Sequence, residues 1–326
     1  MEQRLHILRL LYTLCVLCIL CVLCACAKRH SSRTTIAVVP KGQAHMFWQT
    51  VRAGAEKCAA DEHVDMIWTA PSTETDLSGQ ANIMEDFVNG RVDAIVVAPS
   101  HRKALIPVAT RAVREGIPVV VIDSGMDFDQ SVSYIATDNY QGGVIAARRM
   151  GELLNGRGTV AILGIAAGSG SGLEREGGFQ DTIRKEFPGI TVVGYQFTES
   201  DRTRGLAVAE DFLTRFPNLN GLFGSNESSA VAAARAVTNR GLQGKVKIVG
   251  FDTSSDLIQA VRDGVVDALV GQQPFRMGCE GVRAAVAALQ HRPVDKRIDT
   301  GTVLVTRANL DSPDIQRLLA PATASR

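Results

Sequence analysis

Residues 94–122 read AIVVAPSHRKALIPVATRAVREGIPVVVI, and this stretch decides the fold. It opens with Ala94-Ile95-Val96-Val97 and closes with Val119-Val120-Val121-Ile122, two short runs rich in β-branched residues. Such runs are typical of strands that are buried on both faces of a parallel sheet. Between them, residues 103–114 are expected to form a helix. The stretch therefore predicts a strand, a crossover helix and a second strand parallel to the first.

The same alternation of strand and helix runs through most of the chain and restarts once, with a join near Asp138. It predicts an α/β fold of two similar lobes, each a doubly wound parallel sheet. Further strands are expected at residues 35–39, 64–68, 160–163, 190–193, 221–223 and 246–249, and further helices at 47–61, 77–89, 174–186, 204–215 and 228–240.

Composition and charge exclude several classes of function. The chain has 326 residues and a net charge of +1, and its basic residues are not gathered into one run. A nucleic-acid partner is not expected, because proteins that bind nucleic acids present a concentrated basic face. The sequence contains no Gly-x-Ser-x-Gly or His-Glu-x-x-His motif, and no Cys-x-x-Cys beyond the first thirty residues. We therefore expect no enzymatic activity, no cofactor and no metal.

A glycine-rich segment, Gly164 to Gly172, lies between an expected strand and an expected helix. This is where a phosphate could bind to the start of a helix. The segment lacks the Gly-Lys-Ser/Thr ending of a P-loop, and its spacing misses the dinucleotide fingerprint. We interpret it as a turn or as backbone that approaches a ligand, and not as a nucleotide site.

The N-terminus has the layout of an export signal. Arg4 and Arg9 precede an apolar run over residues 10–27, and a basic start followed by an apolar middle is the pattern of a secretory signal. The run ends Leu23-Cys24-Ala25-Cys26, which resembles a bacterial lipobox with Cys26 as the lipidated residue. We expect a signal peptide over 1–25 and a lipidated linker over 26–33, which together give an exported, lipid-anchored protein of the cell envelope or periplasm. An uncleaved membrane anchor and an ordinary cleaved signal are the alternatives.

Two cysteines, Cys58 and Cys279, lie beyond this segment. The residues around each of them are typical of a helix. A disulfide between them is open in an oxidising compartment, but we expect two buried free thiols.

Polar and aromatic residues follow the expected strands directly. The carboxyl ends of parallel strands meet at one edge of a sheet, and ligands of open α/β sheets bind there. Carboxylates and carboxamides suit neighbouring hydroxyl groups, and aromatic faces cover the C–H face of a sugar. The residues concerned lie at 45–48, 123–124, 137–139, 225–227, 251–253 and 272–273.

The chain from about Thr35 to Thr306 resembles the periplasmic sugar-binding proteins of the ribose-binding type, the soluble components of ABC importers. The order and spacing of several short motifs across the chain carry this resemblance. They are Phe47-Trp48, Ile122-Asp123, the segment 136–143, the segment 174–179, 200–202, 225–227, 249–252 and Gln272.

The resemblance implies two lobes joined by a three-segment hinge, with a ligand held in the cleft between them. The N-terminal lobe would comprise 34–138 and 273–299, the C-terminal lobe 139–272 and 300–320, with a tail over 321–326. The resemblance also implies a set of ligand-binding residues, to which we add Asp138 at the join: His45, Phe47, Trp48, Asp123, Asn226, Asp252 and Gln272.

Three positions depart from the ribose-binding pattern. Ser124 and Leu173 stand where arginines contact the ligand in the ribose protein, and Ser200 replaces a third aromatic residue. Ser124 and Leu173 stay among the expected ligand-binding positions. The departures predict a differently shaped and less cationic pocket, and they argue against ribose itself.

Each assignment has a plainer alternative. Phe47 and Trp48 could be core residues at the start of a helix, Asp252 could cap a helix that begins near Ser254, and His45 could face solvent. Two charge pairs, Glu174-Arg175 and Asp201-Arg202, favour a solvated surface or an ion pair between lobes.

The function expected on these grounds is that of a lipid-anchored solute-binding protein. It would bind a monosaccharide or similar polyol and deliver it to the transmembrane subunits of an ABC permease, by lobe closure on the ligand. A sensory receptor with the same fold, for chemotaxis or quorum sensing, is the alternative. A transcription regulator is not expected, since an export signal occupies the N-terminus. We expect a monomer.

Overall fold

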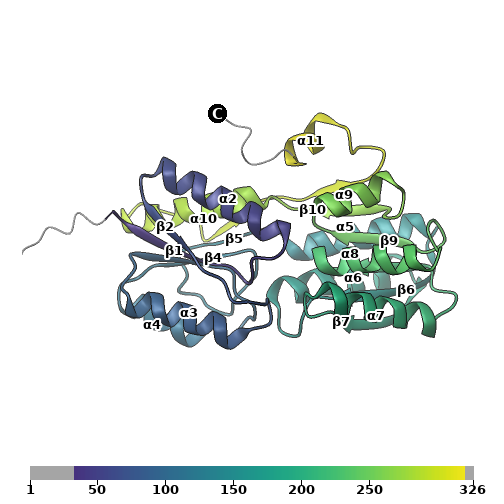
Figure 1. The fold of residues 1–326 in the computed structure, drawn as a ribbon, viewed down its shortest axis with the longest axis horizontal. Coiled ribbons are helices and arrows are strands. Elements are labelled where there is room, and N and C mark those ends of the chain that lie inside the picture. Colours follow the sequence, from purple (N-terminus) through teal and green to yellow (C-terminus); the bar gives the residue numbers. More distant parts are fainter. Residues whose placement is uncertain (1–32, 320–326) are drawn as a thin grey trace, which may run out of the picture. The chain divides into compact units, whose positions relative to one another are not determined.

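The computed structural model describes residues 33–319 (Figure 1). The expected signal peptide, Cys26 and the tail 321–326 lie outside the described residues. Within 33–319, no helix is both long enough and apolar enough to cross a bilayer.

The first lobe is built on a six-stranded sheet with the order β11-β5-β4-β3-β1-β2. Its neighbouring strands all pair in parallel. Helices α2 and α10 cover one face, and α3 and α4 cover the other (Figure 1). The strands are β1 (Thr35–Val39), β2 (Asp65–Trp68), β3 (Ala94–Val97), β4 (Val119–Ile122), β5 (Tyr134–Ala136) and β11 (Arg297–Asp299), and the helices are α2 (Met46–Asp61), α3 (Leu77–Asn89), α4 (Ile106–Arg114) and α10 (Pro274–Leu289).

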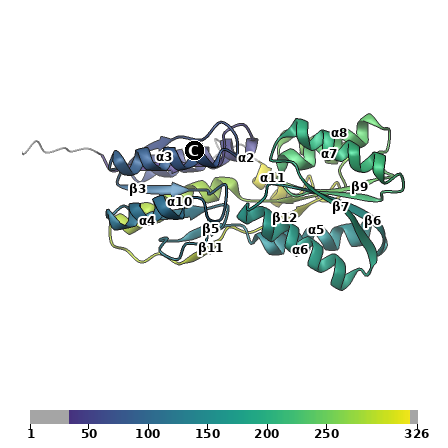
Figure 2. The same ribbon diagram turned by 90° about the horizontal axis from the view of Figure 1, so that it is seen from below.

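The second lobe repeats this plan with the strand order β12-β10-β9-β8-β6-β7. Helices α5 and α6 lie on one face of the sheet, and α7 and α8 lie on the other (Figure 2). Its strands are β6 (Arg157–Gly164), β7 (Gly189–Phe197), β8 (Gly221–Gly224), β9 (Lys247–Phe251), β10 (Ala268–Gly271) and β12 (Val303–Val305), and its helices are α5 (Asn139–Leu153), α6 (Gly170–Glu186), α7 (Arg202–Arg215), α8 (Glu227–Asn239), α9 (Ser255–Arg262) and α11 (Pro313–Leu319).

Local sequence explains where these elements lie. The predicted strand residues of β3 and β4 are buried along their whole length, as expected for strands with helices on both faces. Several helices begin at a side chain that accepts a hydrogen bond from the backbone of the first turn. Asp76 accepts from Gly79 N, Asp138 from Gln141 N and Asp201 from Arg204 N.

The structure differs from the sequence-based prediction in several places. Helix α6 begins at Gly170 and not near Glu174, because Ser169 caps it and Gly170 to Gly172 form its first turn. The short strand β5 was not expected. Strand β12 pairs antiparallel with β10, so the second sheet is not wholly parallel.

The chain passes between the two sheets at three places within 33–319: from β5 to α5, from β10 to α10 and from β11 to β12. The long helices α2 and α10 pack tightly in the first lobe. A Cβ atom placed on Gly54 would lie 1.9 Å from the carbonyl oxygen of Phe275, and one on Gly278 would lie 1.9 Å from that of Val51. Only glycine allows the two helices to approach so closely.

Cys58 and Cys279 form a disulfide between α2 and α10, with Cα atoms 5.1 Å apart. The expectation of two free thiols is therefore wrong. Sequence could not reveal the pairing, because the two residues are 221 positions apart and only the packing of α2 on α10 brings them together.

Candidate functional site

The two lobes meet through hydrogen bonds between their loops and helix starts. Lys41 Nζ donates to Ser171 Oγ (3.0 Å), the backbone N–H of Phe47 donates to Glu227 Oε2 (3.2 Å), and Ser200 Oγ donates to Glu74 Oε2 (2.8 Å). At one edge, Arg102 N donates to Gly168 O across the same boundary. The carboxyl ends of strands from both sheets therefore face one cleft.

The centre of this cleft is a small polar cavity of about 20 Å³, roughly the room of one water molecule. We call the side chains that line it the inner cluster. From the first lobe it contains the predicted residues His45, Phe47, Trp48 and Asp123, together with Lys41 and Glu74. From the second lobe it contains the predicted residues Asn226, Asp252 and Gln272, together with Ile165, Ser171 and Arg175.

Phe47 and Trp48 begin α2 and lie edge to face, with ring centroids 4.9 Å apart. Both rings line the inner cavity, and both also belong to the hydrophobic core of the first lobe. Phe47 and Trp48 are therefore both core residues and cleft residues.

Asp123 lies at the carboxyl end of β4, where its carboxylate forms a buried ion pair with Lys41 (Nζ to Oδ2, 2.8 Å). A buried carboxylate needs such a partner, because burial removes the water that would otherwise solvate its charge. Ser124 is fully buried beside it and accepts from Ser171 N (2.9 Å). Ser124 thus joins the two lobes next to the inner cluster.

Asp252 lies at the carboxyl end of β9 and also pairs internally. Its Oδ1 accepts from Gln272 Nε2 (2.6 Å) and its Oδ2 accepts from Glu227 N (2.8 Å). Residue Ser254 occupies the N-cap position of α9, so Asp252 does not cap that helix. Burial raises the pKa of Asp252 to about 6, although nearby Arg175 and the bond from Gln272 act in the opposite direction.

Arg175 is 2% exposed, so its prediction as part of a solvated surface pair is wrong. Its guanidinium donates to Asn139 Oδ1 (2.8 Å), Ser225 O (3.0 Å) and Gln272 Oε1 (3.0 Å). It also stacks over the ring of Phe251, 4.2 Å from the centroid. A planar fork of donors suits this position better than a point charge would.

Three predicted positions do not line the inner cavity. One is Ser124, whose hydroxyl contacts Ser171. Leu173 is 42% exposed, and Asp138 uses its side chain to cap α5. Lys41 and Arg175 both line the cavity, and the comparison with the ribose-binding pocket stays a prediction.

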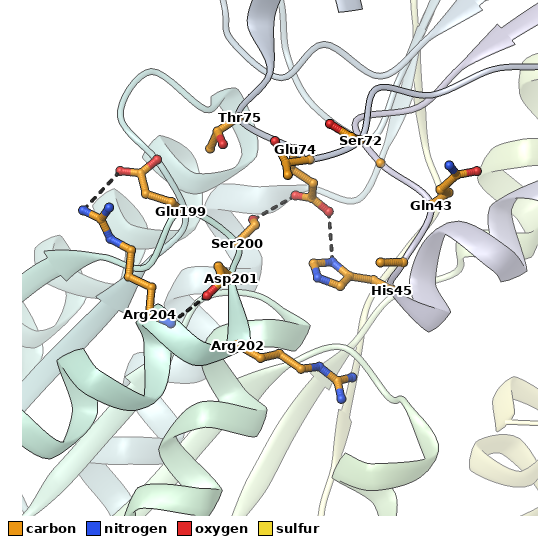
Figure 3. A pocket seen from close by; sticks show the side chains of 13 residues that line it. Gln43, His45, Ser72, Glu74, Thr75, Glu199, Ser200, Asp201, Arg202 and Arg204 are labelled. Atoms are coloured by element: carbon orange, nitrogen blue, oxygen red, sulfur yellow. Dashed lines mark hydrogen bonds and ion pairs between the residues drawn. The ribbon is translucent and has the colours of Figure 1, made fainter. Parts of the chain in front are cut away.

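Glu74, which sequence analysis missed, accepts hydrogen bonds from three side chains. Its Oε1 accepts from Trp48 Nε1 (2.6 Å). The same oxygen accepts from His45 Nδ1 (2.9 Å), and Oε2 accepts from Ser200 (Figure 3). Ser200 in turn accepts from Asn226 Nδ2 (2.9 Å). Glu74 lies in the loop between β2 and α3, several residues beyond the strand end, so a search of the first residues after each strand could not find it.

The His45–Glu74 pair is charged. Burial alone would lower the pKa of His45, but the hydrogen bond and charge of Glu74, helped by Glu227 and Asp252, raise it to about 9. Burial likewise opposes the ionisation of Glu74, but His45, Lys41 and the bond from Trp48 lower its pKa to about 2. At neutral pH the site therefore holds an imidazolium next to a carboxylate.

A larger cavity of about 670 Å³ opens beside the inner cluster, and we call it the mouth cavity. His45, Glu74 and Ser200 form its inner wall, and Glu199, Asp201 and Arg204 lie further out (Figure 3). Asp201 and Arg202 do not pair with each other as predicted. Asp201 caps α7, and Arg202 donates to Glu227 Oε1 (2.9 Å) and to Asp256.

The arrangement of two similar lobes around this cleft has counterparts among known proteins. A model of the periplasmic binding protein domain matches residues 36–293. The chain belongs to the periplasmic binding protein domain family. A D-ribose/D-allose-binding protein from Pseudomonas aeruginosa is 31% identical over 285 residues, which cover 83% of this chain and 88% of that protein.

Solved structures of this family are also similar. A carbohydrate transporter solute-binding protein from Agrobacterium radiobacter, in complex with D-arabinose, has a TM-score of 0.87 and 34% identity, covering 89% of this chain and all of the other. An ABC transporter solute-binding protein from Agrobacterium vitis with bound D-fucose has a TM-score of 0.85 and 36% identity, covering 86% and 98%. The homologues of this chain are thus sugar-binding proteins of ABC importers.

Proposed function

We propose that this protein binds a monosaccharide or similar polyol in the inner cluster and delivers it to the membrane subunits of an ABC importer. One observation carries the proposal. Asp123 and Asp252, from opposite lobes, lie with Asn226 and Gln272 beside the rings of Phe47 and Trp48. Carboxylates and amides would bind ring hydroxyls, and the aromatic rings would cover the C–H face of a sugar.

Binding would be coupled to movement of the lobes. The inner cavity of about 20 Å³ is far smaller than a sugar ring, and its polar groups pair with one another. A sugar would therefore enter when the lobes separate, and its hydroxyls would replace some of these internal pairs on closure. Contacts to both lobes would favour the closed form, which is the state that a permease would recognise.

A thermal-shift panel tests the proposal. The full-length chain, purified in detergent and freed of bound solute by unfolding and refolding, is melted with pentoses, hexoses, polyols and nucleotides. A sugar at about 100 times its dissociation constant should stabilise the protein by about 2.7 kcal/mol. Asp252→Asn should lose this shift, and Glu85→Gln, a change on the outer face of α3, should keep it. A shift produced by nucleotides alone would contradict the proposal.

We also propose that Cys26 carries a lipid that anchors the protein to a membrane, with residues 26–33 as the tether. The sequence Leu23-Cys24-Ala25-Cys26 after an apolar run supports this. Mass spectrometry of the mature N-terminal peptide should find an acylated Cys26. Cys26→Ser should remove the modification, and an unmodified Cys26 in the wild-type protein would contradict the anchor. We propose that the protein acts as a monomer, without catalysis.

A further inference from the structure

The Glu74 carboxylate serves three donors at once, and they come from both lobes. Trp48 and His45 donate to one oxygen, and Ser200 donates to the other. The side chain is only 12% exposed, so few of its interactions are shared with water. A buried carboxylate with several donors is held in one position.

The bond to Glu74 determines which ring nitrogen of His45 remains available to a ligand in the cleft. Its Nδ1 is committed to Glu74, and its Nε2 has no hydrogen-bond partner among residues 33–319. The imidazole borders both the inner cavity and the mouth cavity. Because both nitrogens of an imidazolium carry a proton, Nε2 is a hydrogen-bond donor available to the cleft.

The charged groups around His45 come from both lobes. Glu74 lies in the loop before α3, Glu227 begins α8, and Asp252 follows β9, so three carboxylates act on the ring. The charge of Lys41 in turn lowers the pKa of Glu74. Only Glu74 is bonded to the ring itself, so the other two carboxylates add to the field without orienting the imidazole.

Glu74 also orients Trp48. The indole Nε1–H donates to the same Oε1 atom that accepts from His45, so one carboxylate oxygen sets the position of the ring wall and of the cationic donor together. Loss of this oxygen would release both side chains. Ser200, in contrast, touches only the other oxygen.

We propose that Glu74 is a positioning residue that determines specificity: one of its carboxylate oxygens holds both His45 Nδ1 and Trp48 Nε1, which leaves His45 Nε2 to the cleft, so the site selects solutes that place a hydrogen-bond acceptor there. This inference rests on the proposed function. A hydroxyl, ring or carbonyl oxygen would satisfy the donor, and a solute with a bare carbon at that place would leave it unpaired. Sites that hydrogen-bond a substrate group reject analogues that lack it.

The first test needs no sugar. In the full-length protein, NMR titration should give His45 a pKa near 9. In Glu74→Gln, which keeps an acceptor but loses the charge, the titration should move toward the ordinary histidine value of about 6.5. In a Trp68→Phe background the emission of Trp48 should also shift on Glu74→Gln. Glu85→Gln, an exposed carboxylate on α3 that pairs with Arg111, is the matched control and should change neither readout.

The second test measures affinity for D-arabinose, D-fucose and D-allose by calorimetry between pH 6 and pH 10. Wild-type affinity should fall as the pH rises through about 9, and Glu74→Gln should bind at least about tenfold more weakly at pH 7.5. His45→Gln keeps a neutral donor, so its affinity should not follow that fall. Ser200→Ala removes only the hydrogen bond from Ser200 to Glu74 and leaves His45 and Trp48 anchored, so it should keep the pH profile.

The outcomes separate this inference from the proposed function. If no sugar binds the wild-type protein, the proposed function fails and selection of solutes by Glu74 fails with it, while the NMR titration still decides the positioning role. Unchanged His45 titration in folded Glu74→Gln overturns that role. Unchanged sugar affinity in the same variant overturns the role in specificity. If Glu74→Gln does not fold, a flat pH profile in His45→Gln supports the inference, and a profile equal to wild type overturns it.

Discussion

Asp123 and Asp252 occupy equivalent places in the two lobes. Asp123 follows β4 and Asp252 follows β9, and each of these strands is third from the β11 or β12 edge of its sheet. Both aspartates have a positive φ, 60° and 73°, which is uncommon for residues other than glycine. The repeated backbone turn brings one carboxylate from each sheet to the inner cluster. Their partners differ, since Asp123 pairs with Lys41 and Asp252 with Gln272 and Glu227 N.

The equivalence predicts that neutralising Asp252 abolishes tight binding. Asp252→Asn keeps the size of the side chain but loses a charged acceptor, and hydrogen bonds to charged groups contribute about 1.5–3 kcal/mol. We expect at least a tenfold loss of affinity in calorimetry with the sugar found by thermal shift, with an unchanged circular dichroism spectrum. Asp256→Asn, on the exposed start of α9, is the control. Wild-type affinity in Asp252→Asn would mean that the sugar binds elsewhere.

The raised pKa of Asp252 predicts weaker binding in mild acid. The carboxyl takes up a proton as the pH falls through about 6, and the neutral acid is a poorer acceptor. Affinity at pH 5 should therefore be lower than at pH 7.5. The affinity of Asp252→Asn should not show this decrease between pH 7.5 and pH 5. If wild type and variant lose affinity equally, another group causes the pH dependence.

The same shift has a definite sign for stability. Asp252 ionises at about 6 in the folded protein and near 3.8 ordinarily, so its ionisation disfavours the folded state. The protonated carboxyl therefore stabilises the folded state. The free energy of unfolding should decrease as the pH rises from about 4 through 6, because Asp252 loses its proton over this range. Urea unfolding of wild type and Asp252→Asn across this range measures the difference.

The disulfide between Cys58 and Cys279 predicts sensitivity to reduction. Removing a native disulfide typically lowers the free energy of unfolding by about 2–5 kcal/mol. We expect Cys58→Ser/Cys279→Ser to melt at a lower temperature than wild type and to keep sugar binding at 25 °C, because the bond lies in the core between α2 and α10. The variant's melting should not respond to dithiothreitol. If denatured wild type shows two more titratable thiols than denatured Cys58→Ser/Cys279→Ser, the bond is absent.

The close approach of α2 and α10 predicts a large difference between two glycine substitutions. Gly54→Ala places a methyl group against the backbone carbonyl of Phe275 and should destabilise the protein by about 2 kcal/mol or more, as overpacking of rigid atoms does. Gly177→Ala, on α6, meets no atom within 4 Å and should be neutral or stabilising by up to about 1 kcal/mol. Urea unfolding compares the two, and equal values would contradict the packing of these helices.

Much of the fold could be predicted from local pattern. Runs of β-branched residues predicted β3 and β4. The helix predicted over residues 77–89 has the same bounds as α3. Both predictions depend only on the pattern of residues close together in the chain. The predicted start of α6 was displaced because Gly170 to Gly172 suggest a loop, whereas Ser169 caps the helix and these glycines form its first turn. Strand β12 was missed because it pairs with β10 only after the chain has passed from β11 in the first sheet back to the second sheet.

The sequence by itself determined the two-lobe α/β architecture and the site residues that lie directly after strands, because strand ends converge wherever parallel sheets form. Tertiary structure alone decided the rest. It buried Arg175 among Asn139, Ser225 and Gln272, joined Cys58 to Cys279, and placed Glu74 against His45, Trp48 and Ser200. Each depends on contacts between residues far apart in the chain, and a charged side chain in a loop has the same local pattern whether it ends in solvent or in a buried cleft.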